Sequence, residues 1–434
     1  MRILVISNSP WDDSNSFGST FSNFFQGVDK KDIASIYCSN GYPNTNSCSR
    51  FFRISEKGLA KSIFKRKNAA GEEVFQTIEA EAKQAQLSPK GIVSFAKKHR
   101  WILFFWAREF LWNLGSWKSK RLNTFIDSFQ PDIIVLPTYS FSYINKLALY
   151  IQKKWQLPMI SYVSDDEYTL KQFSLSPLYW VNRLYQRKWV KRGIANSKIL
   201  YTISKIQKED YEKCFNIPCK VLTKFSDFEV SAELKKEYGK PLKLIYTGNI
   251  GGGRWKSLKI IADVLKELNK DRIFARMEIY TPTPITRRMS LALNIQNCSE
   301  IKGKVSAMAV KDLQYNADIL IHVEAMDFKN RLAVRQSFST KLVDYFKMAR
   351  PILAVGPTNV ASLSHLIENN CAMVCQSKPE VKSALKQAIN DSEYLNILSN
   401  NAYQCGRLNH NRNSMQKSFF ADLKNLCEER GKYK

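Results

Sequence analysis

The sequence lacks the residue patterns that define several large classes of proteins. Its nine cysteines include no CxxC pair, which excludes a zinc ribbon and gives no disulfide framework. The four histidines form no HExxH helix and have no ligand spacing, so no metal site is predicted. No stretch supplies the roughly 18 uncharged apolar residues that a membrane-spanning helix needs. Hydrolase motifs such as GxSxG are also absent.

The composition is that of a globular and strongly basic protein. With 44% hydrophobic and 12% aromatic residues the chain can bury sizeable cores, which excludes disordered, collagen-like and coiled-coil proteins. Its length of 434 residues predicts two or three domains. The 66 Lys and Arg residues outnumber the 39 Asp and Glu residues, for a net charge of +27. A charge of this size attracts phosphates, nucleic acid or anionic lipid, and composition does not choose among them.

Short apolar runs recur along the chain with helix-length spacers between them. Continuous rather than alternating runs are typical of strands covered on both faces, as in parallel sheets with helical crossovers. The runs form two series and so predict two α/β domains. The predicted strands are 3–6, 33–37, 133–136, 159–163 and 199–203, then 242–246, 277–280, 319–323 and 352–355, and the predicted helices of the second series are 257–268, 340–348 and 381–389.

The joint between the two series is placed near 224–241, a polar stretch that ends in Gly239, Lys240 and Pro241. It separates a first group of predicted strands from a second. We therefore predict an N-terminal domain at 1–224, a second domain at 225–409 and a C-terminal helix within 410–434.

A basic insertion is predicted over residues 51–121 of the first domain. It carries fifteen Lys or Arg, six Asp or Glu and no strong strand signal. Within it, the aromatic segment 101–112 is interrupted by Arg108 and Glu109 and flanked by cations on both sides. Aromatic rings bracketed by cations suit a helix that lies in a membrane interface. The alternative is a buried aromatic helix.

A loop of small residues follows the first predicted strand and opens a helix. Ser16, Gly18 and Ser19 offer hydroxyls and backbone N–H groups, which suit an anionic or hydroxyl-rich ligand. The loop has no GxGxxG pattern, so a dinucleotide fingerprint is not indicated. The alternative is a purely structural turn at Gly18.

The strongest motif is a strand, a glycine loop and a helix start over residues 246–257. Four glycines let the backbone approach a ligand closely, the helix N-terminus favours anions, and two cations add full charges. The motif predicts diphosphate binding, with a flexible loop and solvated cations as the alternative; a Walker A loop is excluded because GxxxxGK[ST] is absent. The residues predicted to contact the ligand are Gly248, Asn249, Gly252, Gly253, Arg254 and Lys256.

A third motif begins a helix within residues 335–346. Ser339 or Thr340 can cap this helix, which places Lys341 in its first turn beside exposed amides. Asp344 follows on the same face. A cation and a carboxylate on one face predict contacts to a phosphate and to a ribose diol. The alternative is a surface ion pair.

These motifs resemble the GT-B glycosyltransferases, specifically the retaining GT4-like enzymes of bacterial capsule and O-antigen biosynthesis. The segment 339–345, followed by Arg350 and Pro351, is similar to the family's donor-binding helix and the strand after it. Where the family has two Glu in an E-x7-E pattern, this sequence has Gln336 and Asp344. The family's donor loop has two cations, of which only Arg254 is matched here.

The resemblance implies a fold of two Rossmann-like parallel-sheet domains that face each other across a cleft. The second domain would bind a nucleotide sugar, the first a saccharide acceptor through Ser16, Gly18 and Ser19, and the helix in 410–434 would return to the first domain. It also implies transfer with retention of configuration, without a metal and with no cofactor besides the nucleotide-sugar substrate.

The resemblance further implies roles for three acidic residues. The family places a His or an acidic residue near the transferred sugar, and Asp165 and Asp166 occupy that place as predicted catalytic residues. The alternative is that acidic residues 165–167 cap the next helix. Glu324, which opens the loop 324–338, is expected at the donor sugar.

The resemblance implies an acceptor linked to a polyprenyl diphosphate, and hence a cytoplasmic protein held peripherally on the anionic inner face of the cell membrane. The rival interpretation of the charge is nucleic-acid binding, for which a helix-like basic run with interleaved aromatics is a candidate; we favour lipid and expect no nucleic-acid partner. The alternative function is a non-catalytic basic protein of the same fold. The basic run comprises Arg183, Arg187, Lys188, Lys191, Arg192 and Lys198.

Overall fold

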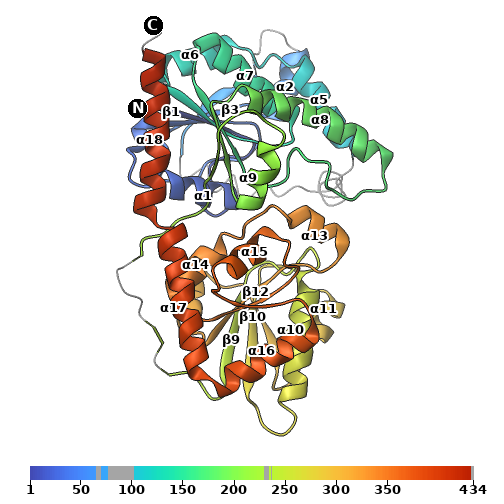
Figure 1. The fold of residues 1–434 in the computed structure, drawn as a ribbon. Coiled ribbons are helices and arrows are strands. Elements are labelled where there is room, and N and C mark those ends of the chain that lie inside the picture. The colour runs from blue at the N-terminus through green and yellow to red at the C-terminus, as the bar shows by residue number, and fades with distance from the viewer. Residues whose placement is uncertain (65–69, 77–101, 229–233, 236, 432–434) are drawn as a thin grey trace. The chain divides into compact units, whose positions relative to one another are not determined.

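The structure is a computed structural model that describes residues 1–64, 70–76, 102–228, 234–235 and 237–431. The chain divides into two compact units, shown in Figure 1. The first unit comprises residues 1–170, 174–222 and 416–434, and the second comprises residues 171–173 and 223–415.

The first unit is built on an eight-stranded sheet in the order β4-β3-β2-β1-β5-β6-β7-β8. Neighbouring strands are parallel except for β3 and β4, which are antiparallel. The five strands predicted from apolar runs are confirmed. The strands are β1 (Ile3–Ser7), β2 (Ile33–Tyr37), β3 (Arg50–Arg53), β4 (Glu72–Val74), β5 (Ile133–Pro137), β6 (Met159–Val163), β7 (Ile199–Thr202) and β8 (Cys219–Val221).

The interpretation of residues 51–121 as an insertion without a strand is wrong at its start. Residues 50–53 form β3, which pairs with β2 next to the edge of the sheet, and residues 72–74 form the edge strand β4. Only Phe51 and Phe52 of β3 are buried, and an Arg stands at each end. A two-residue apolar run is too short to reveal a strand in the sequence.

The helices of the first unit begin and end at residues with clear local causes, and α6 (Lys120–Phe129) is an example. Ser119 caps it by accepting a hydrogen bond from the backbone N–H of Leu122. Its buried side chains recur at helical spacing, at 122, 125, 126 and 129. The other helices are α1 (Ser16–Phe24), α2 (Glu56–Phe64), α5 (Ile102–Leu114), α7 (Ser142–Trp155), α8 (Pro177–Ala195) and α9 (Lys205–Glu212), with a short 3-10 turn at Lys30–Asp32.

The last helix, α18 (Arg412–Gly431), contributes its residues from Gln416 onward to the first unit. Phe419 is buried there, and its ring packs against the rings of Phe24 and Tyr201. The Gln416 side chain donates hydrogen bonds to the backbone carbonyls of Phe24 and Gln26. The end of the chain therefore completes the core of the first unit.

The second unit has a six-stranded parallel sheet in the order β11-β10-β9-β12-β13-β14. The four predicted strands and three predicted helices are confirmed. The strands are β9 (Leu242–Thr247), β10 (Ala275–Tyr280), β11 (Ser299–Gly303), β12 (Ile319–Val323), β13 (Ile352–Val355) and β14 (Met373–Cys375); the helices are α10 (Arg254–Leu268), α11 (Arg287–Leu293), α12 (Ala307–Tyr315), α13 (Phe328–Val334), α14 (Lys341–Met348), α15 (Ala361–Glu368), α16 (Lys378–Asn390) and α17 (Ser392–Asn409).

Helices cover both faces of the second sheet. Helices α10, α11 and α16 pack together on one side, and α12, α14 and α17 pack on the other (Figure 1). The order of strands reverses between β9 and β12, which are neighbours although β10 and β11 separate them in the chain. In open α/β sheets ligands bind beyond the carboxyl ends of the strands at such a switch point. We therefore expect a ligand-binding site at the loops that follow β9 and β12.

None of the helices in the described ranges is both long enough and apolar enough to cross a membrane. Helix α5 exposes the rings of Phe104, Trp106 and Phe110, while Trp112 is buried. The aromatic segment is therefore neither wholly buried nor wholly exposed. Trp101 and the cations of 97–100 lie outside the residues that the structure describes.

Candidate functional site

The loop between β9 and α10 requires glycine at two positions. Gly248 has a φ of +140°, and a Cβ there would lie 3.3 Å from the Nζ of Lys341. Gly253 has a φ of +87°, and a Cβ there would lie 2.6 Å from an Oδ2 of Asp327. Both conformations are ones that side chains rarely adopt. The glycines thus let the loop approach Lys341 and the start of α13.

The backbone amides at the start of α10 are already used within the loop. The N–H groups of Arg254, Trp255 and Lys256 donate to the carbonyls of residues 251, 250 and 253. No side chain caps this helix, whose cap residue is Gly253. The expectation that its first amides bind an anion is therefore not supported by this arrangement, and side-chain cations carry that role.

Arg254 points from the first turn of α10 to the end of β12. Its Nη2 and Nε lie 2.9 and 3.0 Å from Oε2 of Glu324, which is buried. Burial raises the pKa of the Glu324 carboxyl, and the charges of Arg254 and Lys341 oppose that shift. Ser257 fixes the position by donating to the backbone carbonyl of Glu324 over 2.7 Å. Both predicted residues, Arg254 and Glu324, thus meet at the switch point.

Lys341 begins α14 and reaches the same place. Its Nζ lies 4.4 Å from the ring centroid of Tyr246, at the end of β9. Burial lowers the pKa of Lys341 to about 8, the charge of Glu324 opposes this shift and the charge of Arg254 adds to it. A desolvated ammonium beside a guanidinium attracts a polyanion strongly, because little water competes for it.

His322 is a buried residue close to the charges of Lys341 and Arg254. It is completely buried on β12, and neither ring nitrogen has a hydrogen-bond partner among the described residues. Burial, followed by the charges of Lys341 and Arg254, lowers its pKa well below the usual value, so the ring is neutral. His322 is therefore a core histidine whose hydrogen-bonding groups are not satisfied by the described residues.

The start of α14 differs from the prediction. Thr340 is the cap residue but its side chain makes no capping hydrogen bond, and the N–H of Ser339 donates instead to Oγ of Ser362. Neither predicted hydroxyl caps the helix. Asp344 is paired with Lys224, whose Nζ lies 2.6 and 2.8 Å from its two carboxylate oxygens. Lys224 belongs to none of the motifs described above, so its contact with Asp344 could not be predicted from the sequence.

The remaining predicted donor residues lie around the loop. The side chain of Asn249 accepts hydrogen bonds from Thr283 and from the N–H of Gly251, which shapes the turn. Gly252 and Lys256 are exposed. The structure thus brings Arg254, Glu324 and Lys341 together, with Gly248 beside them, and leaves Lys256 at the surface.

In the first unit, the loop after β1 is held by its own contacts. Asn15 caps α1 by accepting the N–H of Gly18 over 2.8 Å, and a Cβ on Gly18 would lie 2.0 Å from the carbonyl oxygen of Asp12. Gly18 is therefore buried for packing reasons, as the structural alternative expects. Ser16 and Ser19 are exposed.

The acidic stretch after β6 contains two different environments. Asp166 is buried, and its carboxylate accepts hydrogen bonds from the N–H and hydroxyl of Thr169. Its Oδ1 also lies 3.4 Å from Nη2 of Arg183. These contacts hold a turn, and the next helix, α8, is capped by Ser176, so the capping alternative is wrong for Asp166. Asp165 is exposed, and its backbone carbonyl accepts a hydrogen bond from Gln207.

Glu167 is a further candidate for the functional site and was not predicted from the sequence. Its carboxylate accepts a short hydrogen bond from the hydroxyl of Ser140, in the loop after β5. Burial raises its pKa to about 7, the Ser140 hydrogen bond opposes the shift, and the charge of Asp165 adds to it. A carboxyl that titrates near neutrality can give or take a proton at working pH. The only sequence signal was its place in the acidic run.

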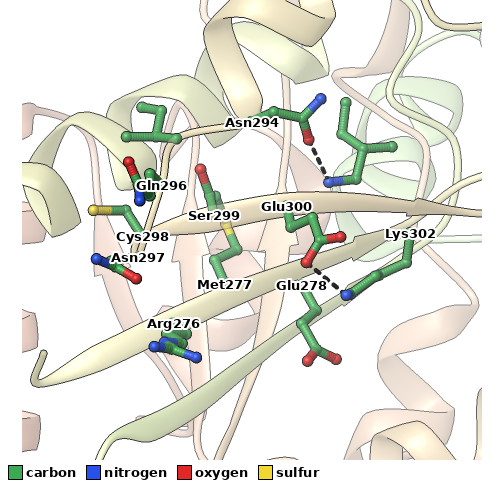
Figure 2. Close-up of a pocket in the computed structure, with 12 residues that line it drawn as sticks. Arg276, Met277, Glu278, Asn294, Gln296, Asn297, Cys298, Ser299, Glu300 and Lys302 are labelled. Carbon is green, nitrogen blue, oxygen red and sulfur yellow. Dashed lines mark hydrogen bonds and ion pairs between the residues drawn. The ribbon is translucent and has the colours of Figure 1, made fainter.

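A cavity of about 640 Å³ lies elsewhere in the second unit (Figure 2). Strands β10 and β11 and the loop 294–298 line it, and Arg276, Asn297 and Glu300 are among its residues. It contains none of the predicted donor residues, and lies at the sheet edge rather than at the switch point. The cavity is therefore distinct from the candidate site.

Neither the models of known protein families nor the curated proteins give a match to this sequence. Solved structures do. HepE of Anabaena in complex with UDP matches with a TM-score of 0.62 at 10% identity, over 98% of this chain and 100% of that one. A trehalose-6-phosphate structure from E. coli bound with UDP-2-fluoro glucose matches with a TM-score of 0.58 at 11% identity, over 98% and 99%.

A third similar structure is an alpha,alpha-trehalose-phosphate synthase (UDP-forming) from Burkholderia xenovorans in complex with glucose-6-phosphate. It has a TM-score of 0.56 at 11% identity, over 98% of this chain and 100% of that one. Agreement across both sheets at such low identity is agreement in fold. The chain therefore has the GT-B fold, with two parallel-sheet α/β domains.

Proposed function

We propose that this protein is a glycosyltransferase that moves a sugar from a nucleotide-sugar donor to a saccharide acceptor. The observation that carries the proposal is the meeting of Arg254, Lys341 and Glu324 at the switch point of the second sheet. Two cations next to a glycine loop suit a diphosphate, and a carboxylate beside them suits sugar hydroxyls.

In this proposal Lys341 and Arg254 hold the diphosphate and stabilise the negative charge that develops on the leaving nucleotide. Arg254 is already oriented by Glu324, so little reorganisation is needed when the donor binds. Asp344 would accept hydrogen bonds from the ribose diol in exchange for its contact with Lys224. Because two similar structures contain UDP or a UDP sugar, we propose a uridine nucleotide as the donor.

In the first unit we propose that Asp165 and Glu167 serve the reacting sugar or the acceptor. Asp165 is the exposed carboxylate, and Glu167 has a pKa of about 7 because of burial. Asp166 would position the stretch rather than touch substrate, since its oxygens are engaged with Thr169 and Arg183. The exposed hydroxyls of Ser16 and Ser19 remain candidates for acceptor contacts.

A panel of nucleotide sugars tests the proposal. Thermal unfolding of the protein with each compound should show stabilisation by one nucleotide class, since a ligand at 100 times its dissociation constant stabilises by about 2.7 kcal/mol. Release of the free nucleoside diphosphate should then follow when a saccharide acceptor is added. If no nucleotide sugar shifts the unfolding temperature or turns over, the proposed activity is wrong.

We expect the transfer to retain anomeric configuration and to proceed without added Mg²⁺ or Mn²⁺. Retention follows from the resemblance to retaining enzymes, and the second expectation from the two cations already placed at the diphosphate. Product stereochemistry by NMR checks the first, and rates with and without each ion check the second. An inverted linkage, or a rate that depends on either ion, would contradict the corresponding statement.

The affinity for the nucleoside diphosphate should fall as the pH rises above about 8. Burial holds the pKa of Lys341 at about 8, so the charge that binds the phosphates is present below that pH and is lost above it, by up to tenfold in affinity per pH unit. The free energy of unfolding should change in the opposite direction and rise above this pH. The reason is that the cost of burying the charge disappears as Lys341 loses its proton. Calorimetric titration with UDP across this range measures the effect, and a Lys341→Ala variant should show a flat profile.

We also propose that the acceptor is carried by a polyprenyl diphosphate and that the protein docks on anionic membrane, as in capsule or O-antigen biosynthesis. Two packed helices of the first unit expose apolar side chains at helical spacing, followed on α8 by the exposed cations Lys188, Lys191 and Arg192. Arg183 and Arg187 of the basic run are instead held by backbone carbonyls, which weakens the nucleic-acid alternative. The apolar side chains at this spacing are Trp106, Phe110 and Leu114 on α5 and Leu178, Val181, Leu184 and Tyr185 on α8.

The protein should sediment with anionic vesicles and much less with neutral ones. Because both charge and apolar contact contribute, salt should weaken the binding and Phe110→Glu should weaken it further. A matched change at Leu408, an exposed apolar residue of the second unit, should have no effect. Sedimentation with vesicles containing phosphatidylglycerol measures this; tight binding to single-stranded RNA with no vesicle binding would contradict the proposal.

A further inference from the structure

Two histidines and a cysteine meet in the second unit, away from the candidate donor site. His365 belongs to α15, Cys405 to α17, and His410 follows the end of α17. The Nε2 atoms of the two rings are 3.1 Å apart, and Sγ of Cys405 is 3.3 Å from Nε2 of His365. All three ligand atoms lie within 4.8 Å of one another. The sequence showed no ligand spacing because the residues are 40 and 45 positions apart.

Hydrogen bonds alone do not satisfy this arrangement. Nε2 of His365 faces both Nε2 of His410 and the sulfur of Cys405. In a neutral imidazole this nitrogen has either one hydrogen or one lone pair, so it can make one good hydrogen bond and not two. One of these two contacts of the partly exposed His365 is then left without a shared proton, which costs some free energy.

A metal ion between the three atoms would satisfy all of them. With Zn–N bonds of about 2.0–2.1 Å and Zn–S bonds of about 2.3 Å, a tetrahedral site separates two nitrogens by about 3.3 Å and a nitrogen from a sulfur by about 3.6 Å. Two of the observed separations, 3.1 and 3.3 Å, are within a few tenths of an ångström of these values, and the third pair of ligand atoms lies within 4.8 Å. Imidazole and thiolate together are ligands that zinc prefers.

The surroundings form a second shell around these atoms. Cys371, which is completely buried, shares a hydrogen bond with Cys405. The side-chain amide of Asn409 donates toward the sulfur of Cys405 over 3.8 Å. The rings of Phe338 and Phe346 enclose the two histidines, at centroid distances of 5.2–6.1 Å. Such an aromatic-lined position, with two of the three side chains buried and a thiol next to the ligand sulfur, suits a zinc site.

We propose that His365, Cys405 and His410 bind one zinc ion, with a water molecule as the fourth ligand, since His365 is partly exposed. The Cys405 thiol loses its proton to solvent as the Zn–S bond forms, and the imidazoles bind as neutral rings. The ion ties α15 to the end of α17. Both packing rings come from the chain around α14, since Phe346 is on that helix and Phe338 precedes it. The zinc site would therefore support α14, the helix that begins with Lys341, through the side chains of Phe338 and Phe346. This structural role is separate from the proposed transferase activity.

Metal content of the full-length protein tests the proposal without any measurement of activity. Protein purified from zinc-supplemented medium and dialysed should contain about one zinc per chain. Reconstitution with Co²⁺ should give visible bands and a thiolate-to-cobalt charge-transfer band in the near ultraviolet. Removing the ion should lower the unfolding temperature of the second unit by roughly 5–10 °C, and adding Zn²⁺ back should restore it.

Variants locate the ion. Cys405→Ala and His410→Gln should lose the zinc. Cys371→Ser should retain the zinc less well in the presence of a chelator. The control variant Cys298→Ala, which removes a buried cysteine at the other edge of the sheet, should keep the zinc. The wild-type cobalt spectrum needs no variant, so misfolding of a variant does not decide the result. A folded wild-type protein with neither zinc nor a thiolate–cobalt band would overturn the proposal. Zinc that survives in Cys405→Ala, or a Cys371–Cys405 disulfide in the native protein, would also overturn it.

Discussion

Lys341→Ala should lower the rate of sugar transfer by roughly ten- to a hundredfold, because it removes a charge-assisted contact that is strongest when charge develops on the diphosphate. The variant should fold normally. Partial burial of the ammonium lowers its pKa to about 8, so removing the charge relieves a cost rather than creating one. Steady-state kinetics and thermal unfolding on the same samples measure both effects.

The combination of outcomes separates a binding role from a structural one. A residue that only supports the fold would lose activity and stability together, whereas Lys341→Ala should lose activity with an unchanged or higher unfolding temperature. Lys347→Ala, at an exposed position of the same helix, is the matched control and should behave like the wild type. Normal turnover by Lys341→Ala would remove the proposed donor site. Arg254→Ala is a less clean test, since it leaves the buried Glu324 carboxylate without its partner.

The central strands of both sheets could be predicted because each is buried on both faces. All five residues of β1, β5, β6 and β12 are buried, and a continuous apolar run is the direct result. The strands that were missed lie at or near the edges, where one face or one end meets solvent. In β11, Glu300 and Lys302 interrupt the run, and β14 has only three residues. Edge strands do not need the pattern that reveals central ones.

The residue types of the candidate site could be predicted, but not their pairing. A glycine loop after a strand and a lysine at a helix start are local features, and they led to Gly248, Arg254 and Lys341. That Arg254 pairs with Glu324, 70 positions away, and Asp344 with Lys224, 120 positions away, depends on how the strands are ordered in the sheet. The same holds for the cluster around Cys405, whose members come from separate helices. Sequence distance hides these contacts because tertiary packing makes them.

The acidic stretch after β6 shows how such pairing changes an interpretation. Asp165, Asp166 and Glu167 are equivalent in the sequence, and the structure separates them into an exposed carboxylate, a buried and paired one, and a partly buried one with a raised pKa. The separation depends on Arg183, which is buried on α8. Its Nη2 donates to the carbonyls of Asp166 and Thr169 over 2.7 and 3.0 Å.

Arg183→Ala should therefore destabilise the first unit by about 3–5 kcal/mol, because it leaves the buried Asp166 carboxylate and two buried carbonyls without their donor. For a unit of this size the loss corresponds to a fall in unfolding temperature of roughly 10 °C. Differential scanning calorimetry measures it, as a shift in the transition of the first unit with the second unit unchanged. Lys191→Ala, at an exposed position of the same helix, is the control and should leave both transitions in place.

The same variant should also change the chemistry of the acidic stretch. Nη1 of Arg183 donates to Oγ of Ser140, and that hydroxyl in turn donates to the Glu167 carboxylate. Without the guanidinium the pKa of Glu167 should rise further, since the charge of Arg183 is one of the factors that lower it. Arg183→Lys restores the charge but not the planar set of donors, so it should recover the pKa of Glu167 better than it recovers stability. Equal recovery of both, measured by NMR titration of the Glu167 carboxyl and by calorimetry, would mean that charge rather than hydrogen-bond geometry holds this turn.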